Sequence, residues 1–190
     1  REAVLHLSGF QYQGIYGVSY RVKEQITMAD LSFRVQQVIK NELDVTQAQL
    51  FRNGITLLNG LASFSDPHQV RVEGARGEAT CRAESIVIAT GTKPAESARV
   101  PINGQTIILS DQVLQMPQLP KTLIVVGGGV IGVEYTCMFA PLGIRVVLIE
   151  KRSRLLEFAD AEIVEALCYH LRDHRVTLRL NEEGDTVEQL

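Results

Sequence analysis

The C-terminal part of the sequence alternates between short apolar runs and longer amphipathic stretches, and this regularity restricts the folds open to the chain. The runs LIVV (123–126), RVVLIE (145–150) and RVTLRL (175–180) have the composition of strands, while residues 130–142 and 160–173 have the length and apolar spacing of helices. Strands that alternate with helices in this way form a parallel sheet with crossover connections. The region therefore predicts a βαβαβ unit in an α/β fold.

A run of glycines joins the first of these strands to the helix that follows it. Residues 127–132 read GGGVIG and fit the pattern G-x-G-x-x-G. In a dinucleotide-binding unit Gly127 would permit the tight turn, Gly129 would let the backbone approach a pyrophosphate, and Gly132 would let the helix pack closely on the sheet. The N–H groups at the helix start would bind the phosphates. A plain tight turn is the alternative, but the complete strand–glycine–helix context favours a nucleotide site.

The second strand ends in an acidic residue that bears on the choice of nucleotide. Glu150 lies 18 residues after Gly132, where a carboxylate would accept hydrogen bonds from a ribose 2′-hydroxyl. Because a carboxylate repels a 2′-phosphate, Glu150 favours NAD. Lys151, Arg152 and Arg154 could instead turn toward a 2′-phosphate and admit NADP. A solvated basic loop is an equal alternative, so the sequence leaves the coenzyme preference open.

The N-terminal part predicts a long helix followed by a β-meander. Thr27 is a suitable N-cap for a helix from about Met28 to Arg52, because its hydroxyl can accept a hydrogen bond from the first turn. Strand-like runs follow at 55–64, 69–74 and 79–90, separated by turn residues. This pattern of one long helix followed by strands differs from the strand–helix alternation in the C-terminal part and indicates a separate domain.

The region between the predicted meander and the predicted βαβαβ unit contains shorter elements. We expect a fully buried strand over Ile86–Ala89, a short strand at 106–109 and a short helix that Ser110 caps and that runs through Met116. Prolines follow directly and mark a boundary. The predicted domains are residues 1–116 and residues 117–190.

Charge and cysteine usage exclude several function classes. The net charge is -3 and the sequence pI is about 5.8, which does not suit a nucleic acid or an anionic membrane as partner. No apolar stretch reaches about 18 residues, so no transmembrane helix is expected. Cys81, Cys137 and Cys168 are too widely spaced for a metal or dithiol site, and we interpret them as buried thiols of a reducing, cytoplasmic compartment.

Three segments resemble one known family. GGGVIGVEYTCMFAPLGIRVVLIEKRSRLLEFADAEI (127–163) resembles the NAD(P) domain of the FAD-dependent pyridine nucleotide-disulfide oxidoreductases, which include dihydrolipoamide dehydrogenase and glutathione reductase. SIVIATGTKP (85–94) is similar to the "ATG" segment of that family, and LLNGLASFSDPHQVRV (57–72) to the strand pair before it. The resemblance implies part of an FAD-binding domain, made of the long helix and the β-meander, followed by a Rossmann-like NAD(P)-binding domain.

Within the family, three shorter segments are most similar to the soluble pyridine nucleotide transhydrogenase branch. They are RLLEFAD (154–160), YHL (169–171) and RLNEE (179–183). The resemblance implies a flavoenzyme that transfers hydride between NADPH and NAD via FAD. The alternatives are a disulfide reductase similar to dihydrolipoamide dehydrogenase, and an isolated nucleotide-binding module without turnover.

The resemblance also implies roles for individual residues. The residues expected to bind the nicotinamide dinucleotide are Gly127, Gly129, Val130, Ile131, Gly132, Glu150, Lys151 and Arg152. Glu134 would face the nicotinamide and the flavin, as the catalytic residue that family members pair with a Lys. Thr90 and Gly91 would lie against FAD. Gly60 and Ala62 would present backbone to the FAD adenosine, although an ordinary strand turn explains these two equally well.

The resemblance finally implies that further parts of such a protein lie outside this sequence. Family members begin with their own G-x-G-x-x-G unit for FAD, and a dithiol segment and the Lys partner of Glu134 would also precede Arg1. The rest of the NAD(P) domain and a dimerisation domain would follow Leu190. We therefore expect an internal fragment of a homodimeric or larger homo-oligomeric parent. On its own the fragment should be inactive.

Overall fold

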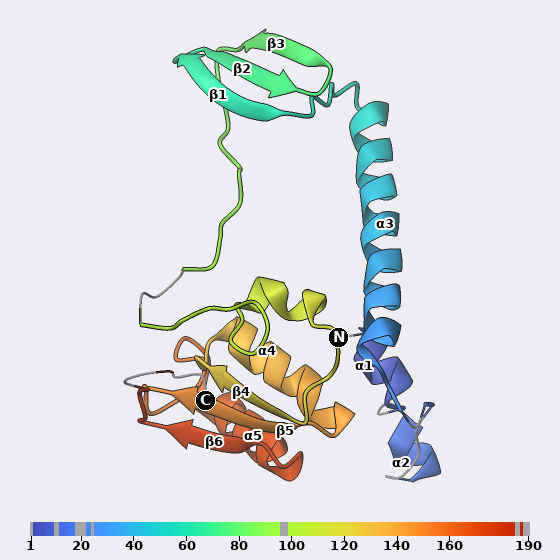
Figure 1. The fold of residues 1–190 in the computed structure, drawn as a ribbon, viewed down its shortest axis with the longest axis vertical. Coiled ribbons are helices and arrows are strands. Elements are labelled where there is room, and N and C mark those ends of the chain that lie inside the picture. The colour runs from blue at the N-terminus through green and yellow to red at the C-terminus, as the bar shows by residue number, and fades with distance from the viewer. Residues whose placement is uncertain are drawn as a thin grey trace. The chain divides into compact units, whose positions relative to one another are not determined.

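The computed structural model describes residues 2–9, 12–17, 22–23, 25–95, 99–184 and 187 (Figure 1). Contacts within the chain define two compact units, one made of residues 1–36 and 94–190 and the other of residues 37–93. Each unit has its own three-stranded sheet.

The sheet of the first unit is parallel, with its strands in the order β4-β5-β6. Its elements follow one another along the chain as β4 (Thr122–Val126), α4 (Val130–Phe139), a 3-10 turn (Ala140–Leu142), β5 (Arg145–Glu150), α5 (Ala161–Asp173) and β6 (Thr177–Leu180). Val126 lies opposite Ile149, and Glu150 opposite Leu180, so the three strands end near one edge. This arrangement confirms the predicted βαβαβ unit.

The core of this unit lies on one face of the sheet. In β5 the side chains of Val146 and Leu148 are fully buried, and they share one apolar cluster with Val133 of α4 and Val164 of α5. Both helices therefore cover the same face. On β4 the side chain of Ile124, which points to the other face, is 61% exposed.

A second, smaller apolar cluster involves the N-terminal helices of this unit. The unit begins with α1 (Glu2–Leu7) and α2 (Gln13–Tyr16), and the first residues of α3 (Met28–Arg52) also belong to it. Ala3 and Val4 of α1 are buried against Met28 and Leu31 of α3. Partly buried side chains near residue 116 and in α4 pack on this cluster.

The connection before β4 differs from the prediction in two ways. Residues 106–109 form no strand, because the Asn103 side-chain oxygen accepts hydrogen bonds from three successive N–H groups, those of residues 105, 106 and 107, at 2.9, 2.9 and 3.0 Å. The predicted Ser110-capped helix is the 3-10 helix η2 (Ser110–Gln115), and its N-cap is Leu109. The Leu109 N–H donates to the Gln112 side chain at 2.9 Å, so a side chain within the turn supplies the cap.

The long helix α3 has the bounds that the sequence predicts, and its caps explain them. The Asp30 N–H donates to the Thr27 hydroxyl at 3.3 Å, and the Thr27 N–H donates to the Asp30 carboxylate at 2.8 Å. A hydrogen bond from Lys23, followed by those from Thr27, lowers the pKa of Asp30 to about 2. At the other end Gly54 adopts a φ of +66°, which ends the helix.

The second unit carries the predicted antiparallel meander of β1 (Leu61–Asp66), β2 (Gln69–Gly74) and β3 (Gly77–Arg82), in the order β1-β2-β3. The expected buried strand Ile86–Ala89 is wrong: residues 83–93 form no strand, and Val87 is 86% exposed. An apolar run becomes a buried strand only where neighbouring strands pair with it, and no strand of the described residues does so.

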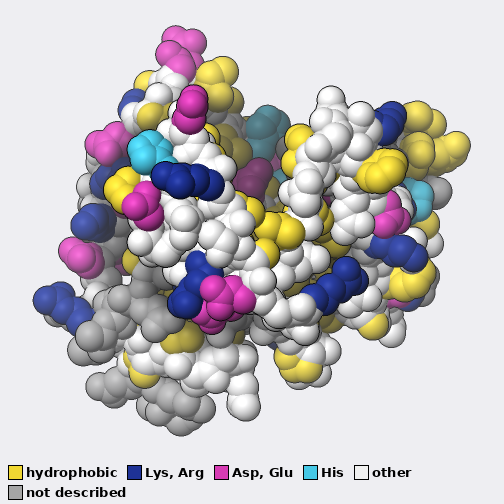
Figure 2. All heavy atoms as spheres, turned by 90° about the horizontal axis from the view of Figure 1, so that it is seen from above, with side chains coloured by type: hydrophobic (Ala, Val, Ile, Leu, Met, Phe, Trp, Pro, Cys, Tyr) yellow, Lys and Arg dark blue, Asp and Glu magenta, His cyan; other side chains and the backbone are white. Residues whose placement is uncertain are grey.

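The surface departs from the sequence-based expectation at two cysteines. Cys168 is buried as expected, but Cys81 and Cys137 are exposed. Cys81 lies in β3, and Cys137 lies on the outer face of α4. Basic and acidic side chains are interspersed over the face shown in Figure 2. Of the helices in the described ranges, none combines the length and apolar character needed to cross a bilayer.

Candidate dinucleotide-binding site

The turn between β4 and α4 has the backbone geometry that its glycines were predicted to permit. Gly127 has a φ of +112°, which side chains rarely allow, and its N–H donates to the carbonyl oxygen of Ile149 at 2.8 Å. A Cβ added to Gly132 would overlap the carbonyl oxygen of Gly127, so α4 packs directly on the turn. Gly129 is the N-cap of α4, and a Cβ added there would meet nothing within 4 Å.

This geometry leaves the start of α4 open to a ligand. The first N–H groups of a helix have no partner within the helix, and the ten residues of α4 carry a dipole that is positive at this end. The space beside Gly129 allows a pyrophosphate to approach the backbone. The turn therefore fits the phosphates of a dinucleotide.

Gly128 stands at a position that the sequence pattern leaves free, and sequence reasoning missed its role. A Cβ at Gly128 would lie 2.5 Å from Cδ2 of Leu155 and 3.1 Å from Cβ of Glu150. Leu155 is fully buried, and the N–H of Leu156 donates to the Gly128 carbonyl oxygen at 3.0 Å. The segment after β5 thus packs on the glycine turn. A third consecutive glycine was the only signal in the sequence.

Glu150 supports the glycine turn from the end of β5. Its carboxylate is 5% exposed and accepts hydrogen bonds from the N–H of Gly128 at 2.6 Å and from the N–H of Arg152 at 2.9 Å. Burial raises the pKa of Glu150, but these hydrogen bonds and the charges of Arg152 and Lys151 outweigh burial and hold the pKa below its ordinary value. A carboxylate accepts about four hydrogen bonds, so Glu150 can still accept one from a ribose hydroxyl.

The basic residues after Glu150 are held to different degrees. The Arg152 guanidinium forms ion pairs with Glu150, Nε to Oε1 at 3.3 Å, and with Glu157, Nη1 to Oε2 at 3.1 Å. Arg154 donates from Nη2 to the carbonyl oxygen of Glu157 at 2.6 Å. The exposed Lys151 makes no hydrogen bond or ion pair with the described part of the chain. Arg152 and Arg154 are therefore held within the loop after β5, whereas the side chain of Lys151 is not.

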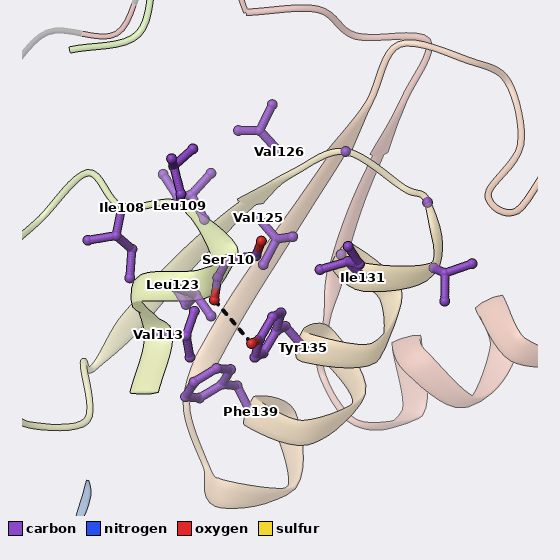
Figure 3. A pocket seen from close by; sticks show the side chains of 15 residues that line it. Ile108, Leu109, Ser110, Val113, Leu123, Val125, Val126, Ile131, Tyr135 and Phe139 are labelled. Atoms are coloured by element: carbon purple, nitrogen blue, oxygen red, sulfur yellow. Dashed lines mark hydrogen bonds between the residues drawn. The ribbon is translucent and has the colours of Figure 1, made fainter. Parts of the chain in front are cut away.

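The first residues of α4 border an apolar cavity of about 540 Å³ (Figure 3). The cavity lies between residues 108–113, β4 and α4, and Gly127, Gly129 and Gly132 are among its lining residues. Val130 and Ile131 also line it and are 50% and 58% exposed. The structure thus brings five of the predicted nucleotide-binding residues together around the start of α4.

Tyr135 lines the cavity one turn farther along α4 than the first residues of that helix. Its hydroxyl donates to the Ser110 carbonyl oxygen at 3.1 Å, which ties α4 to η2 (Figure 3). Burial, together with the negative charges of Asp111 and Glu134, raises the pKa of Tyr135. The predicted catalytic residue Glu134 is exposed on α4, and its side chain makes no hydrogen bond or ion pair with any residue that the structure describes.

The predicted FAD-contacting residues all lie in the second unit. A Cβ at Gly60 would lie 2.5 Å from the Glu73 carbonyl oxygen, so close packing on β2 already requires a glycine there. Ala62 pairs with Val72 in the meander. Thr90 and Gly91 are exposed and lie outside any strand, and Gly91 has a φ of +74°. A contact of these four residues with FAD stays a prediction.

Comparison with known families gives a match over almost the whole chain. The family model described as "Pyridine nucleotide-disulphide oxidoreductase" matches residues 10–190. A soluble pyridine nucleotide transhydrogenase of Mycobacterium bovis (strain BCG) is 47% identical over 190 residues, which are 99% of this chain and 41% of the relative. The soluble transhydrogenase of Marinobacter nauticus is 40% identical over a match that covers 80% of this chain and 33% of the relative. That of Yersinia pestis is 36% identical over a match that covers 99% of this chain and 40% of the relative.

Solved structures have the same fold. LpdA of Mycobacterium tuberculosis superposes with a TM-score of 0.82 at 22% identity, over 97% of this chain and 42% of its own. The HOCl-induced flavoprotein disulfide reductase RclA of Escherichia coli, as a cysteine-to-serine mutant in a Cu(II) complex, gives a TM-score of 0.77 at 25% identity over 99% of this chain and 41% of its own. The chain thus spans about two fifths of the length of these relatives. The family uses FAD and NAD(P). The chain belongs to the pyridine nucleotide-disulphide oxidoreductase family.

Proposed function

We propose that this chain is the nicotinamide-nucleotide-binding segment, with part of the FAD-binding domain, of a flavoenzyme that transfers hydride between NADPH and NAD. The glycine turn of 127–132, with the buried Glu150 behind it, carries this proposal. The 47% identity to proteins named soluble pyridine nucleotide transhydrogenase supports this activity within the family. Their name supports a cytoplasmic enzyme, and we expect its parent protein to be a homo-oligomer.

Different parts of the chain would bind the phosphates and the adenosine ribose of the dinucleotide. The open start of α4, at Gly129, would hold the pyrophosphate through backbone N–H groups. Glu150 would accept a hydrogen bond from the adenosine ribose while it continues to support Gly128. The half-exposed side chains of Val130 and Ile131 would exclude water from the nicotinamide side of the turn. When bound, FAD supplies the hydride acceptor and donor.

Glu134 would orient the nicotinamide relative to the flavin. It follows Gly132 by two residues, and its carboxylate is exposed without a hydrogen-bonding partner in the described ranges. A carboxylate in this position is able to pair with a cation or an amide brought to it by another segment. By sequence we assign residues 1–116 to the FAD-binding domain and residues 117–190 to the NAD(P)-binding domain.

The test uses the full-length protein that contains this segment. We expect the purified protein to carry flavin and to reduce an NAD analogue, such as 3-acetylpyridine adenine dinucleotide, at the expense of NADPH. Glu134→Gln should lower kcat by at least about tenfold, because a positioned charge near the reacting groups is lost, and should leave the flavin spectrum unchanged. Glu165→Gln is the matched control, since this exposed glutamate lies on α5. A protein without flavin, or one that binds flavin but fails to couple NADPH to the analogue, would contradict the proposal.

The second candidate is a disulfide reductase. The likeness to RclA, which is described as a flavoprotein disulfide reductase, favours it. The same preparation should be assayed with NADH and a small disulfide such as lipoamide. Rapid reduction of the disulfide, with slow transfer between nicotinamides, would favour the reductase. The 190-residue chain alone should be colourless and inactive, and a yellow, active preparation would show that it is more than a nucleotide-binding module.

A further inference from the structure

We propose that Tyr135 is a positioning residue for the nicotinamide end of the dinucleotide, because its hydroxyl fixes the spacing of two walls of the apolar cavity beside the glycine turn. The inference rests on the proposed function, since it takes this turn as the pyrophosphate site. Tyr135 lies outside the glycine motif, and no sequence pattern assigns it a role. It acts on the nicotinamide through the shape of the cavity.

The cavity begins at the glycine turn but does not include the residue proposed to bind the ribose. Gly127 and Gly129 are among its lining residues, whereas Glu150 is not. A dinucleotide lies across the carboxyl ends of parallel strands, with its pyrophosphate at such a turn. With its adenosine ribose at Glu150, the nucleotide would extend its nicotinamide end past the turn toward the cavity. The cavity volume of about 540 Å³ is sufficient for this ring, because small-molecule pockets measure roughly 300–1,000 Å³.

Tyr135 joins two elements that face each other across the cavity (Figure 3). One wall comes from η2 and the two residues before it, and the other wall comes from α4. The apolar side chains of these walls are those of Ile108, Leu109, Val113, Ile131 and Phe139. The Tyr135 hydroxyl donates to the Ser110 carbonyl oxygen at 3.1 Å, across 25 positions of the chain. This hydrogen bond therefore holds the two walls at one separation.

The ring of Tyr135 is itself held in place, so its hydroxyl is a rigid link between the walls. The ring stacks on that of Phe139, which is 4% exposed, with the ring centroids 6.2 Å apart and the planes inclined by 29°. Burial, followed by the charges of Asp111 and Glu134, raises the pKa of Tyr135 above its ordinary value of about 10. The hydroxyl therefore keeps its proton at neutral pH and remains a hydrogen-bond donor.

Removal of this hydroxyl should affect only the nicotinamide end of the nucleotide. In Tyr135→Phe the ring and its contact with Phe139 remain, so the direct loss is one hydrogen bond. Without that bond the η2 wall is free to move, and binding of the nicotinamide ring must first fix its position. One hydrogen bond of this kind corresponds to about threefold to fivefold in an equilibrium constant. The glycine turn and Glu150 are unchanged, so binding of the phosphates and the adenosine should not weaken.

The experiment compares NAD with ADP-ribose, which lacks the nicotinamide ring, by calorimetry with the oxidised full-length protein. Tyr135→Phe should raise the Kd of NAD about threefold to fivefold and leave that of ADP-ribose within about twofold. Tyr169→Phe is the matched control, because it removes the same hydroxyl from α5, where the side chain is 69% exposed. This control should change neither constant.

Two results would overturn the inference alone. One is an unchanged Kd of NAD in Tyr135→Phe. The other is an equal loss for NAD and ADP-ribose, which would mean that the hydroxyl supports the fold or the glycine turn as a whole. If the wild-type protein binds neither ligand, the proposed function fails and the inference fails with it. Should Tyr135→Phe not fold, Ile108→Ala, which widens the cavity from the η2 wall, should give the same selective loss of NAD binding.

Discussion

Two apolar runs of this chain look alike as sequences and differ in structure. LIVV (123–126) forms most of β4 and pairs along its length with β5, whereas SIVIAT (85–90) forms no strand and leaves Ile88 71% exposed. The partner of the first run follows after a single helix. The described residues contain no strand that pairs with the second. An apolar run therefore predicts the capacity for a strand, and only a neighbouring strand turns that capacity into structure.

The largest contrast should appear when one leucine is truncated in each of the two compact units that carry these runs. Leu155 is fully buried beside the glycine turn, so Leu155→Ala should lower the free energy of unfolding by about 3 kcal/mol. Leu61→Ala, in β1, should lower it by less than about 0.5 kcal/mol, because Leu61 is 77% exposed. Urea denaturation followed by circular dichroism measures both. Equal losses would mean that the loop after β5 is not part of the core.

Two glycine variants should separate packing from binding within the turn. Gly132→Ala should lower the free energy of unfolding by about 2 kcal/mol, because the new Cβ meets a backbone oxygen that cannot rotate away. Gly129→Ala should lower it by less than about 1 kcal/mol, since its Cβ enters open space and only the N-cap preference for glycine over alanine is lost. The Kd of NAD should nevertheless rise at least about tenfold in Gly129→Ala, because the Cβ occupies the phosphate site. Unchanged NAD affinity would remove Gly129 from the proposed site.

The sequence predicts well where local pattern and local partners coincide. The bounds of β5 are those of the predicted run, and α3 begins and ends where its caps indicate. The strand expected at 106–109 was wrong because the Asn103 side chain holds this backbone in a turn. Of the three cysteines expected to be buried, Cys81 and Cys137 are exposed, because burial depends on how each face is covered and spacing alone does not specify this.

In the candidate site, too, the sequence predicts the residues that belong to a local pattern and misses those that depend on other contacts. The sequence predicts Gly127, Gly132 and Glu150 as site residues because the pattern fixes their places along the chain. It missed the burial of Leu155 against Gly128 and the ion pair between Glu157 and Arg152, because the pattern contains neither contact. Such contacts leave no periodic signal, so only the folded geometry reveals them.

A smaller effect should depend on pH. Because the pKa of Glu150 is lowered in the folded chain, its carboxylate stabilises the fold above its unfolded pKa, and this contribution is lost as pH falls through the folded value. Glu150→Gln should lower the free energy of unfolding by about 1.5 kcal/mol at pH 7. The difference from wild type should shrink below about pH 4, in urea titrations with Glu165→Gln as control. A difference that stays constant from about pH 7 to about pH 3 would contradict this account.

The smallest effect within this chain concerns SIVIAT itself and tests the comparison most directly. Val87→Ser should change the free energy of unfolding of this chain by less than about 0.5 kcal/mol, because the side chain is 86% exposed. The same change in the full-length protein should lower it by about 2 kcal/mol if neighbouring strands bury Val87 there, since a hydroxyl would then replace packed methyl groups. Equal small effects in both proteins would show that this run is a connector, and the resemblance to the ATG segment would then carry no structural meaning. A large effect confined to the longer protein would show that the run needs only a partner to become the buried strand that its composition predicts.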